Sequence, residues 1–226
     1  MAKNKKQQVT DEPIALDVQL SKGEAFIEKN WKKIAIVLAA VIVIVAGFYA
    51  YRHYMNGKEK EAQKAIASAQ TAFAQQQYEQ ALKGEGNSKG FLKIIDEFSG
   101  TETANLAKLY AGLAYAKTDK VDEAIKMLES FSTQDDEMVS PAAIAALGNL
   151  YVQKGDNEKG LKTLIKAAEK ADNDAVSPVF LLQAGEIYES LGQNDKAVEL
   201  YNKIKKQYFR SPLAQEIDMY IERATK

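Results

Sequence analysis

A run of 18 residues without a charged side chain, residues 34–51, constrains this chain more than any other feature. It reads IAIVLAAVIVIVAGFYAY, and as a helix it is about 27 Å long, close to the thickness of a hydrocarbon core. Trp31 precedes the run and Tyr51 closes it, which is the pattern of aromatic rings at two membrane interfaces. Basic residues on both flanks, such as Arg52, can extend toward water. The sequence therefore predicts a transmembrane helix over residues 34–54.

A buried core helix and a cleaved signal peptide are the two other interpretations of such a run. The rest of the chain contains no second long apolar segment against which a core helix could be buried. A signal peptide has a shorter charged leader and a shorter apolar stretch, and no cluster of tyrosines follows it. We therefore predict an uncleaved anchor. A polar, partly disordered segment over residues 1–33 precedes it and includes a short amphipathic helix over 21–31.

The orientation of this anchor follows from the distribution of positive charge. Basic residues close to the run are equally numerous on its two sides, so the local balance does not decide. Lys3, Lys5 and Lys6 add positive charge to the N-terminal side, and positive charge favours the cytoplasm. We predict a single-pass membrane protein with a cytoplasmic N-terminus and an external C-terminal domain.

The composition limits the chemistry that this chain can perform. It has 4 prolines, 13 glycines, one histidine and no cysteine, which favours helix and excludes disulfides and thiolate-bound metals. Its 30 basic and 31 acidic residues give a net charge of -1, without the basic surplus of a nucleic-acid binder. No arrangement of nucleophile, base and orienting group is visible. We expect no enzyme activity, no catalytic residues, and no cofactor or metal.

A repeated pattern with a period of 36 to 37 residues organises residues 101–210. In each unit a glycine is followed by a tyrosine three residues later, a small residue after twelve and a large one after sixteen. The three sets are Gly112, Tyr115, Ala124, Leu128; Gly148, Tyr151, Gly160, Leu164; and Gly185, Tyr188, Ala197, Tyr201. Small residues let two helix axes approach closely, and the large side chains fill the space beside the contact. The pattern predicts three helical hairpins.

Short polar turns and serine–proline pairs predict where these helices begin and end. The turns lie at residues 118–120, 155–157 and 192–194, and connections this short join antiparallel neighbours. Three serines, each followed by a proline, are expected to be the N-caps of later helices. They are Ser140, Ser177 and Ser211.

The small, tyrosine, small and large positions resemble those of the tetratricopeptide repeat. The resemblance implies an all-α protein in which an N-terminal transmembrane helix precedes an α-solenoid of tetratricopeptide-type helical hairpins. Three repeats occupy residues 101–210. Residues 55–100 are expected to form a linker helix, over about 58–83, and a degenerate first helical pair. Residues 211–226 are expected to form a capping helix.

The first helices of such arrays line a concave groove, which is the candidate protein-binding site. Counting from the matched glycines, seven residues point toward this groove, unless they are ordinary surface or partly packed positions. They are Leu109, Leu113, Asn149, Gln153, Leu182, Glu186 and Glu189. Families of this repeat that grip a C-terminal carboxylate use lysine or arginine at the positions held here by Leu109, Ala145 and Leu182, and only Asn149 matches. We therefore expect an apolar-to-acidic groove for an extended or basic peptide.

Three other features suggest sites but fit simpler roles better. The glycines over 84–90 lack the lysine–serine ending and the preceding strand of a phosphate loop, so we predict a flexible inter-helix loop. His53 lies beside the predicted membrane surface and has no partners for metal or proton chemistry. The acidic run 135–137 lacks the spacing of a cation site and favours the start of the helix that follows.

The order of a charged segment ending in Trp-Lys-Lys, one span, a linker and a few repeats is similar to the ancillary subunit of the bacterial Sec translocon. The segments SGTETANLAKLYAGLAY and KGFLKIIDEFSG resemble repeat proteins of Bacteroidetes. The resemblance implies a protein of the inner (plasma) membrane with a periplasmic repeat domain that assists protein export or envelope assembly. Its implied partners are the translocon, periplasmic chaperones or exported polypeptides, and membrane lipid, but no nucleic acid.

A structural scaffold is the alternative function that the sequence leaves open. In this interpretation the span and the long helix over 58–83 pair with copies of themselves in the inner membrane, and the protein is a homo-oligomer.

Overall fold

The computed structural model describes the backbone of residues 15–226 and the side chains of residues 24–226. The disorder expected in the first part of the chain, and the lysines there that bear on orientation, lie largely in residues 1–14, outside the described residues. The chain divides into two compact units, Met1–Tyr54 and Met55–Lys226, and each is considered by itself.

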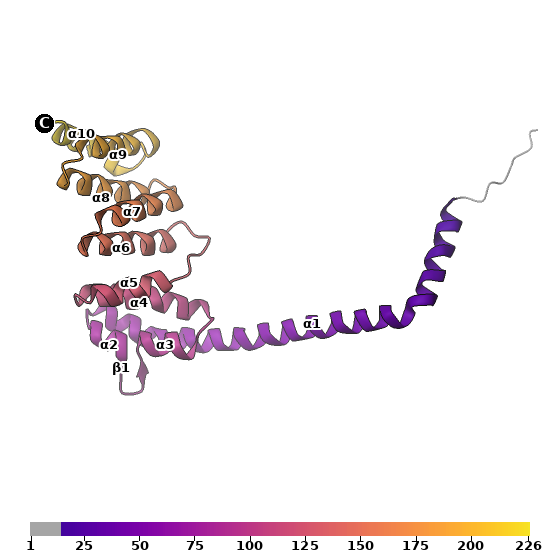
Figure 1. The fold of residues 1–226 in the computed structure, drawn as a ribbon. Coiled ribbons are helices and arrows are strands. Elements are labelled where there is room, and N and C mark those ends of the chain that lie inside the picture. The colour runs from indigo at the N-terminus through magenta and orange to yellow at the C-terminus, as the bar shows by residue number, and fades with distance from the viewer. Residues whose placement is uncertain (1–14) are drawn as a thin grey trace, which may run out of the picture. The chain divides into compact units, whose positions relative to one another are not determined.

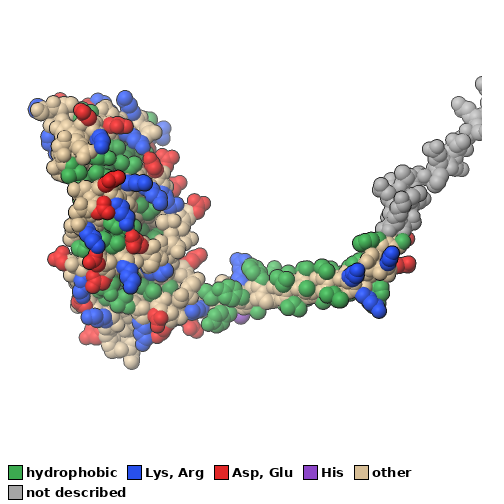
Figure 2. Space-filling model, in the orientation of Figure 1, with side chains coloured by type: hydrophobic (Ala, Val, Ile, Leu, Met, Phe, Trp, Pro, Cys, Tyr) green, Lys and Arg blue, Asp and Glu red, His purple; other side chains and the backbone are tan. Residues whose placement is uncertain are grey.

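One helix, α1 (Ala15–Ala74), contains the whole predicted span (Figure 1). Residues 21–31 are helical as predicted, but they belong to this long helix and not to a short one, because no proline or turn separates them from the apolar run. The side chains of residues 34–51 are almost all exposed, and Figure 2 shows a charge-free hydrophobic surface there. An 18-residue window of this helix has a mean hydropathy of 2.6 and is 0% buried. The described chain thus has one helix long and apolar enough to cross a membrane, and it is not a core helix.

The second unit is a stack of helical hairpins, and the all-α solenoid predicted for this chain is confirmed. The hairpins follow one another in sequence order (Figure 1). Their helices are α4 (Glu102–Lys117) with α5 (Val121–Ser130), α6 (Val139–Gln153) with α7 (Asn157–Ala171), and α8 (Ser177–Ser190) with α9 (Asn194–Gln207). A last helix, α10 (Pro212–Thr225), packs on α9 and buries Ile217 completely.

The matched glycines lie where two helices of a hairpin approach most closely. A Cβ atom on Gly112 would lie only 2.7 Å from Cγ of Leu128, and 3.3 Å from the backbone oxygen of Ala124. A Cβ atom on Gly185 would overlap the ring of Tyr201, a side chain that is itself fully buried. The glycines are therefore required by packing, which is the reason that the sequence pattern predicts.

The turns within the hairpins share one backbone geometry, and it occurs four times. Each turn has a residue with positive φ, and the next residue donates its amide to a carbonyl five residues back. The positive-φ residues are Gln76 (61°), Asp119 (56°), Gly155 (92°) and Gly192 (69°). The amide bonds run from Gln77 to Ala72, Lys120 to Tyr115, Asp156 to Tyr151 and Gln193 to Tyr188, at 2.8–3.0 Å. The turn at 75–77 therefore joins the two halves of a fourth hairpin. In sequence order it is the first hairpin of the stack.

This first hairpin differs from the others because a β-hairpin interrupts its second helix. The predicted continuous helix over 58–83 is wrong, since α1 ends at Ala74 and a short helix follows the turn. The elements after the turn are α2 (Tyr78–Lys83), β1 (Gly84–Glu85), β2 (Ser88–Lys89) and α3 (Phe91–Glu97). The predicted flexible loop over 84–90 is also wrong. It forms an antiparallel ladder in which Gly84 pairs with Lys89.

The packing of the first hairpin repeats that of the other three. Ala69 and Ala81 are buried and twelve residues apart, the separation found between the paired small residues of the later repeats. With the six residues 84–89 set aside, fully buried Phe91 takes the position of Leu128. The sequence predicted a degenerate helical pair here but did not show its matching positions, because Ala69 replaces the glycine and the inserted hairpin shifts the register.

The three serine–proline pairs differ in what the serine does. Ser211 is an N-cap as predicted, because its Oγ accepts a hydrogen bond from the amide of Leu213 at 3.3 Å. Ser140 and Ser177 are instead buried in the first turns of α6 and α8, where their Oγ atoms accept from amides of the preceding loops. Their prediction as N-caps is wrong, because upstream loop residues already satisfy the free amides of these helices.

Candidate protein-binding surface

The predicted groove residues lie on the first helices of three hairpins, α4, α6 and α8, but they differ in exposure. Leu109 is only 8% exposed and belongs to the core between α4 and α6. Leu113 and Leu182 are half-buried against the core, whereas Asn149 and Gln153 are exposed. The exposed part of this surface is therefore mostly polar, with leucine edges.

Two of these first helices are joined by a direct hydrogen bond. Nδ2 of Asn149 on α6 donates to Oε1 of Gln183 on α8 at 3.3 Å, and both side chains are polar and partly or fully exposed. The bond places Asn149 next to the α8 segment that carries Leu182. A bound segment that crosses from α6 to α8 would therefore meet amide groups before it meets the carboxylates of α8.

The acidic end of the predicted groove is largely occupied by the capping helix. Nε and Nη2 of Arg223 on α10 both donate to the Glu189 carboxylate at 2.9 Å, and the Tyr201 hydroxyl donates to it at 2.5 Å. These bonds, led by that from Arg223, keep the pKa of Glu189 below its usual value although burial opposes them. Glu186 is exposed, but its Oε1 also lies 4.0 Å from Arg223. The sequence alone did not predict that α10 packs beside this surface and pairs with its carboxylates.

The acidic run before α6 acts on the helix start, as its position indicates. Oδ1 of Asp136 accepts from the amides of Met138, Val139 and Ser140 at 2.6–3.0 Å. Burial raises the pKa of this carboxyl, but the hydrogen bonds from Ser140 and the backbone outweigh burial and leave the pKa lowered. Asn173 does the same before α8, where its Oδ1 accepts from two amides at 3.0 Å.

Two hollows that the sequence analysis did not predict lie beside α7, the second helix of the middle repeat. One groove, of about 1000 Å³, lies along α7 and the start of α9, with Leu161, Ile165 and Tyr188 among its lining residues. A smaller cleft, of about 320 Å³, lies between α5, α6 and α7. The sequence could have indicated a basic surface here, because α7 carries lysines at helical spacing. They are Lys159, Lys162, Lys166 and Lys170.

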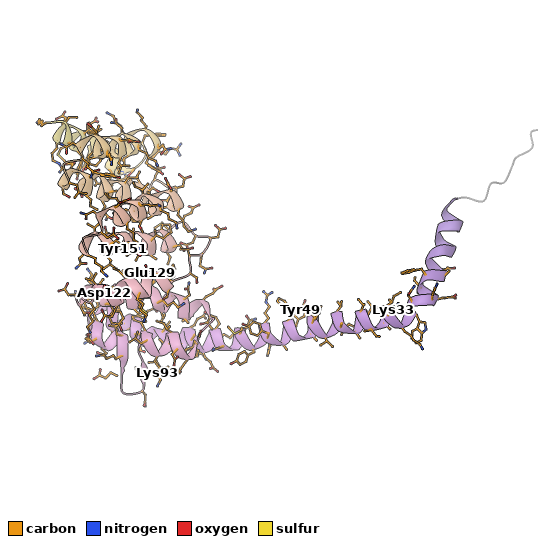
Figure 3. All side chains as sticks on the ribbon, viewed as in Figure 1. Lys33, Tyr49, Lys93, Asp122, Glu129 and Tyr151 are labelled. Atoms are coloured by element: carbon orange, nitrogen blue, oxygen red, sulfur yellow. The ribbon has the colours of Figure 1, made fainter. Side chains whose placement is uncertain are left out.

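One side of the smaller cleft is closed by polar bonds between neighbouring repeats. The Tyr151 hydroxyl on α6 donates to Oε1 of Glu129 on α5 at 2.5 Å, and Figure 3 shows these two side chains meeting between the helices. Nζ of Lys159 lies 3.5 Å from Glu129 and 3.9 Å from the centre of the Tyr151 ring. The hydrogen bond from Tyr151, followed by these charges, keeps the pKa of Glu129 lowered despite burial.

The fold and its surfaces define a solenoid of the tetratricopeptide type, a class in which stacked helical hairpins present grooves to other proteins. The tetratricopeptide repeat-like domain family matches residues 24–219, and the chain belongs to this family.

A solved structure has a similar fold. It is a crystal structure of putative kinesin light chain nearly identical TPR-like repeats from Podosopora anserina. It matches with a TM-score of 0.51 and 15% identity over 74% of this chain and 85% of that chain, which shows a shared fold alone. No curated protein sequence matches the chain.

Proposed function

We propose that this protein is a membrane-anchored protein-interaction module that assists protein export or envelope assembly near the Sec translocon, together with periplasmic chaperones. The observation that carries the anchor is the exposed, charge-free part of α1, which has a mean hydropathy of 2.6 and no buried residues. The observation that carries the interaction role is the solenoid of this repeat family, since stacked repeats form extended surfaces that bind other proteins. The order of anchor and repeats, which resembles the ancillary translocon subunit, supports the place of action.

A membrane anchor allows weak contacts with partners to be sufficient for binding. The exposed part of the first-helix surface is polar around Asn149 and Gln153, without the buried aromatic anchors of a high-affinity interface. Confining such a module to a membrane raises its effective concentration relative to partners in the same membrane. This rise can increase the apparent affinity more than any single added contact does. This supports partners that are themselves bound to the membrane, such as a translocon or an anchored chaperone.

Topology is tested with a single introduced cysteine, because the chain contains none of its own. Asn157→Cys lies at the start of α7, half-buried but beside an open groove. We expect a membrane-impermeant maleimide to label it in cells whose outer membrane is permeabilised and whose inner membrane is intact. Labelling only after the inner membrane is disrupted would place the repeats in the cytoplasm and exclude periplasmic partners.

Partners are tested with a photo-crosslinking amino acid in intact membranes. Placed at Gln153, on the first-helix surface, it should capture translocon subunits or periplasmic chaperones. Placed at exposed Gln215 on α10 it serves as the matched control. Recovery of neither class of protein at Gln153, or equal recovery at both positions, would exclude the specific role at the translocon.

The alternative scaffold function loses part of its support in the structure. The face of α1 that was expected to pair with a second copy is buried within the first repeat. Ala62, Ile66, Ala69 and Ala72 pack in the same core cluster as Phe91 and Ile94. Self-association through this part of α1 would therefore have to use its exposed face, whereas the span over 34–51 is almost entirely exposed.

A further inference from the structure

We propose that the cleft between α5, α6 and α7 binds an acidic, extended segment of a partner protein, at a site separate from the groove of the first helices. This cleft has a volume of about 320 Å³ and is lined by α5 and α7, the second helices of neighbouring repeats, and by α6, the first helix between them. It opens where the loop 131–138, which is longer than the other connections between hairpins, joins α5 to α6. The proposal does not depend on the proposed role at the translocon.

The floor of the cleft is apolar and the rim on α7 is basic. Phe131, Ile144 and Leu147 belong to the floor. Lys166 and Lys170 belong to the rim, and neither forms an ion pair with any described residue. Lys170 is half-buried, so its aliphatic stem covers part of the floor while its ammonium group remains available.

The charge of the cleft is positive after its internal pairs are counted. Glu129 is the one acidic side chain among the residues that line it, and it already accepts from the Tyr151 hydroxyl and faces Lys159. The two remaining lysines of the lining therefore have no internal counter-charge. Carboxylates of a partner complement them, and a basic peptide is repelled.

The dimensions of the rim fit an extended chain. Lys159 and Lys170 are eleven residues apart on α7, which is about 16 Å along the helix axis. An extended segment of about five residues has the same length, and its alternate side chains lie about 6.6 Å apart on one face. Lys166 and Lys170, one helical turn apart at about 6 Å, match carboxylates two residues apart. The intervening apolar side chains can contact the floor.

The recessed shape favours a peptide over a lipid surface. A flat membrane would meet the lysine ammonium groups but would leave the Phe131 and Leu147 floor uncovered, because the floor lies between helices. A narrow chain can enter the cleft and cover that floor. The gain from covering apolar area adds to the charge attraction and distinguishes this site from a general basic surface.

The test uses the full-length chain in zwitterionic detergent micelles and fluorescein-labelled Asp-Leu-Asp-Leu-Asp, measured by fluorescence anisotropy. We expect saturable binding that the doubly substituted Lys166→Gln, Lys170→Gln variant weakens about tenfold. Lys162→Gln is the matched control, because Lys162 lies on the same helix but lines only the larger groove. It should weaken binding less than twofold, and Asn-Leu-Asn-Leu-Asn should bind at least tenfold more weakly than the acidic peptide.

Three outcomes overturn the proposal. The first is the absence of saturable binding of the acidic peptide at millimolar concentration. The second is equal weakening by the Lys162→Gln control, which would show general charge attraction rather than a site. The third is Lys170-dependent binding to phosphatidylglycerol vesicles without binding of the peptide, which would make the rim a lipid contact. Circular dichroism of each variant must equal that of the unchanged chain, and these exposed or half-exposed substitutions leave the core intact.

Discussion

At the scale of single residues, the closest contacts between helices occur at glycines, which have no Cβ atom. Gly148 on α6 faces Gly160 on α7, and a Cβ atom on Gly148 would lie 3.1 Å from the backbone oxygen of Gly160 and 2.9 Å from Cγ of Leu164. A side chain can rotate away from an added methyl group, but a backbone oxygen cannot without moving the helix. Contacts of this kind therefore tolerate substitution least.

Gly148→Ala is expected to destabilise the repeat unit by about 1–3 kcal/mol, because the cost of overpacking exceeds the gain in helix propensity. Gly57→Ala is the matched control on α1, where no atom lies within 4 Å of the added Cβ. Alanine there should leave stability unchanged or raise it by about 0.5–1 kcal/mol. Urea unfolding of the full chain in micelles, followed by circular dichroism at 222 nm, measures both. A Gly148→Ala variant as stable as the parent would contradict the packing role of the glycines.

Asp136 gives a second prediction at this scale. Asp136→Ala should destabilise the chain by about 1–2 kcal/mol, since three amides at the start of α6 lose their acceptor. Asp136→Asn should retain most of the stability, because Asn173 caps the corresponding start of α8 with an amide oxygen. Urea unfolding of the two variants at pH 7 measures the difference.

The pH dependence of Asp136 follows from its lowered pKa. A carboxyl whose pKa is lower in the folded chain stabilises it fully above the unfolded pKa of about 3.9. This contribution is lost as the pH falls through the folded value. The stability advantage of the unchanged chain over Asp136→Asn should therefore be present at pH 7 and shrink below pH 4. An advantage that grows on acidification would contradict the assigned hydrogen bonds.

At the scale of elements, the later hairpins were predictable because their contacts are local. A glycine and its small partner are twelve residues apart across a three-residue turn, so the sequence spacing itself reports the contact. The first hairpin has the same spacing between Ala69 and Ala81, but alanine is too common in helices to stand out. The inserted strands hid the large residue, Phe91, that would have completed the pattern.

The candidate site was predictable only in part, for a related reason. The helix faces followed from counting along each helix, and Asn149 and Gln153 are exposed on those faces. The burial of Leu109 depends on how α4 packs on α6, and the pairing of Glu189 depends on where α10 returns. Contacts between elements far apart in the sequence have no fixed residue spacing. The burial of Leu109 and the pairing of Glu189 could therefore not be predicted by counting residues.

Removal of the inserted β-hairpin tests the interpretation of α2 and α3 as one interrupted helix. Deletion of residues 84–89 joins Lys83 to Gly90, whose backbone already lies against that of Gly84. Combined with Gly90→Ala, it should yield a continuous helix over residues 78–97 and change stability by less than about 1 kcal/mol, as for a surface insertion. Thermal and urea unfolding measure this change. Loss of the cooperative transition would show that the hairpin supports the first repeat.

At the scale of the whole molecule, the chain combines a helix with an exposed apolar surface and a repeat unit with a core of its own. The apolar side chains of residues 34–51 are exposed, as Ile36, Val43 and Ile44 show with 69%, 71% and 70% exposure. The repeat unit, in contrast, has a core of buried large apolar residues that includes Tyr201, Phe91 and Leu164. Exposed apolar surface of this extent is what a membrane span presents, and the proposed function assigns anchoring to this helix and recognition to the repeats.

Two charges in the middle of the span should therefore release the protein from the membrane. In the double variant Val43→Lys, Ile44→Lys the insertion free energy rises by about 5–7 kcal/mol, at about 2.5–3.5 kcal/mol for each lysine near a helix centre. We expect most of this variant in the soluble fraction after alkaline carbonate extraction, whereas the parent chain stays in the pellet. The control carries the same two charges outside the span, as Gln63→Lys and Ala67→Lys on the exposed face of α1, and should also stay in the pellet. Extraction of the parent chain itself would show that α1 does not anchor the protein, because a helix that spans a bilayer resists this treatment.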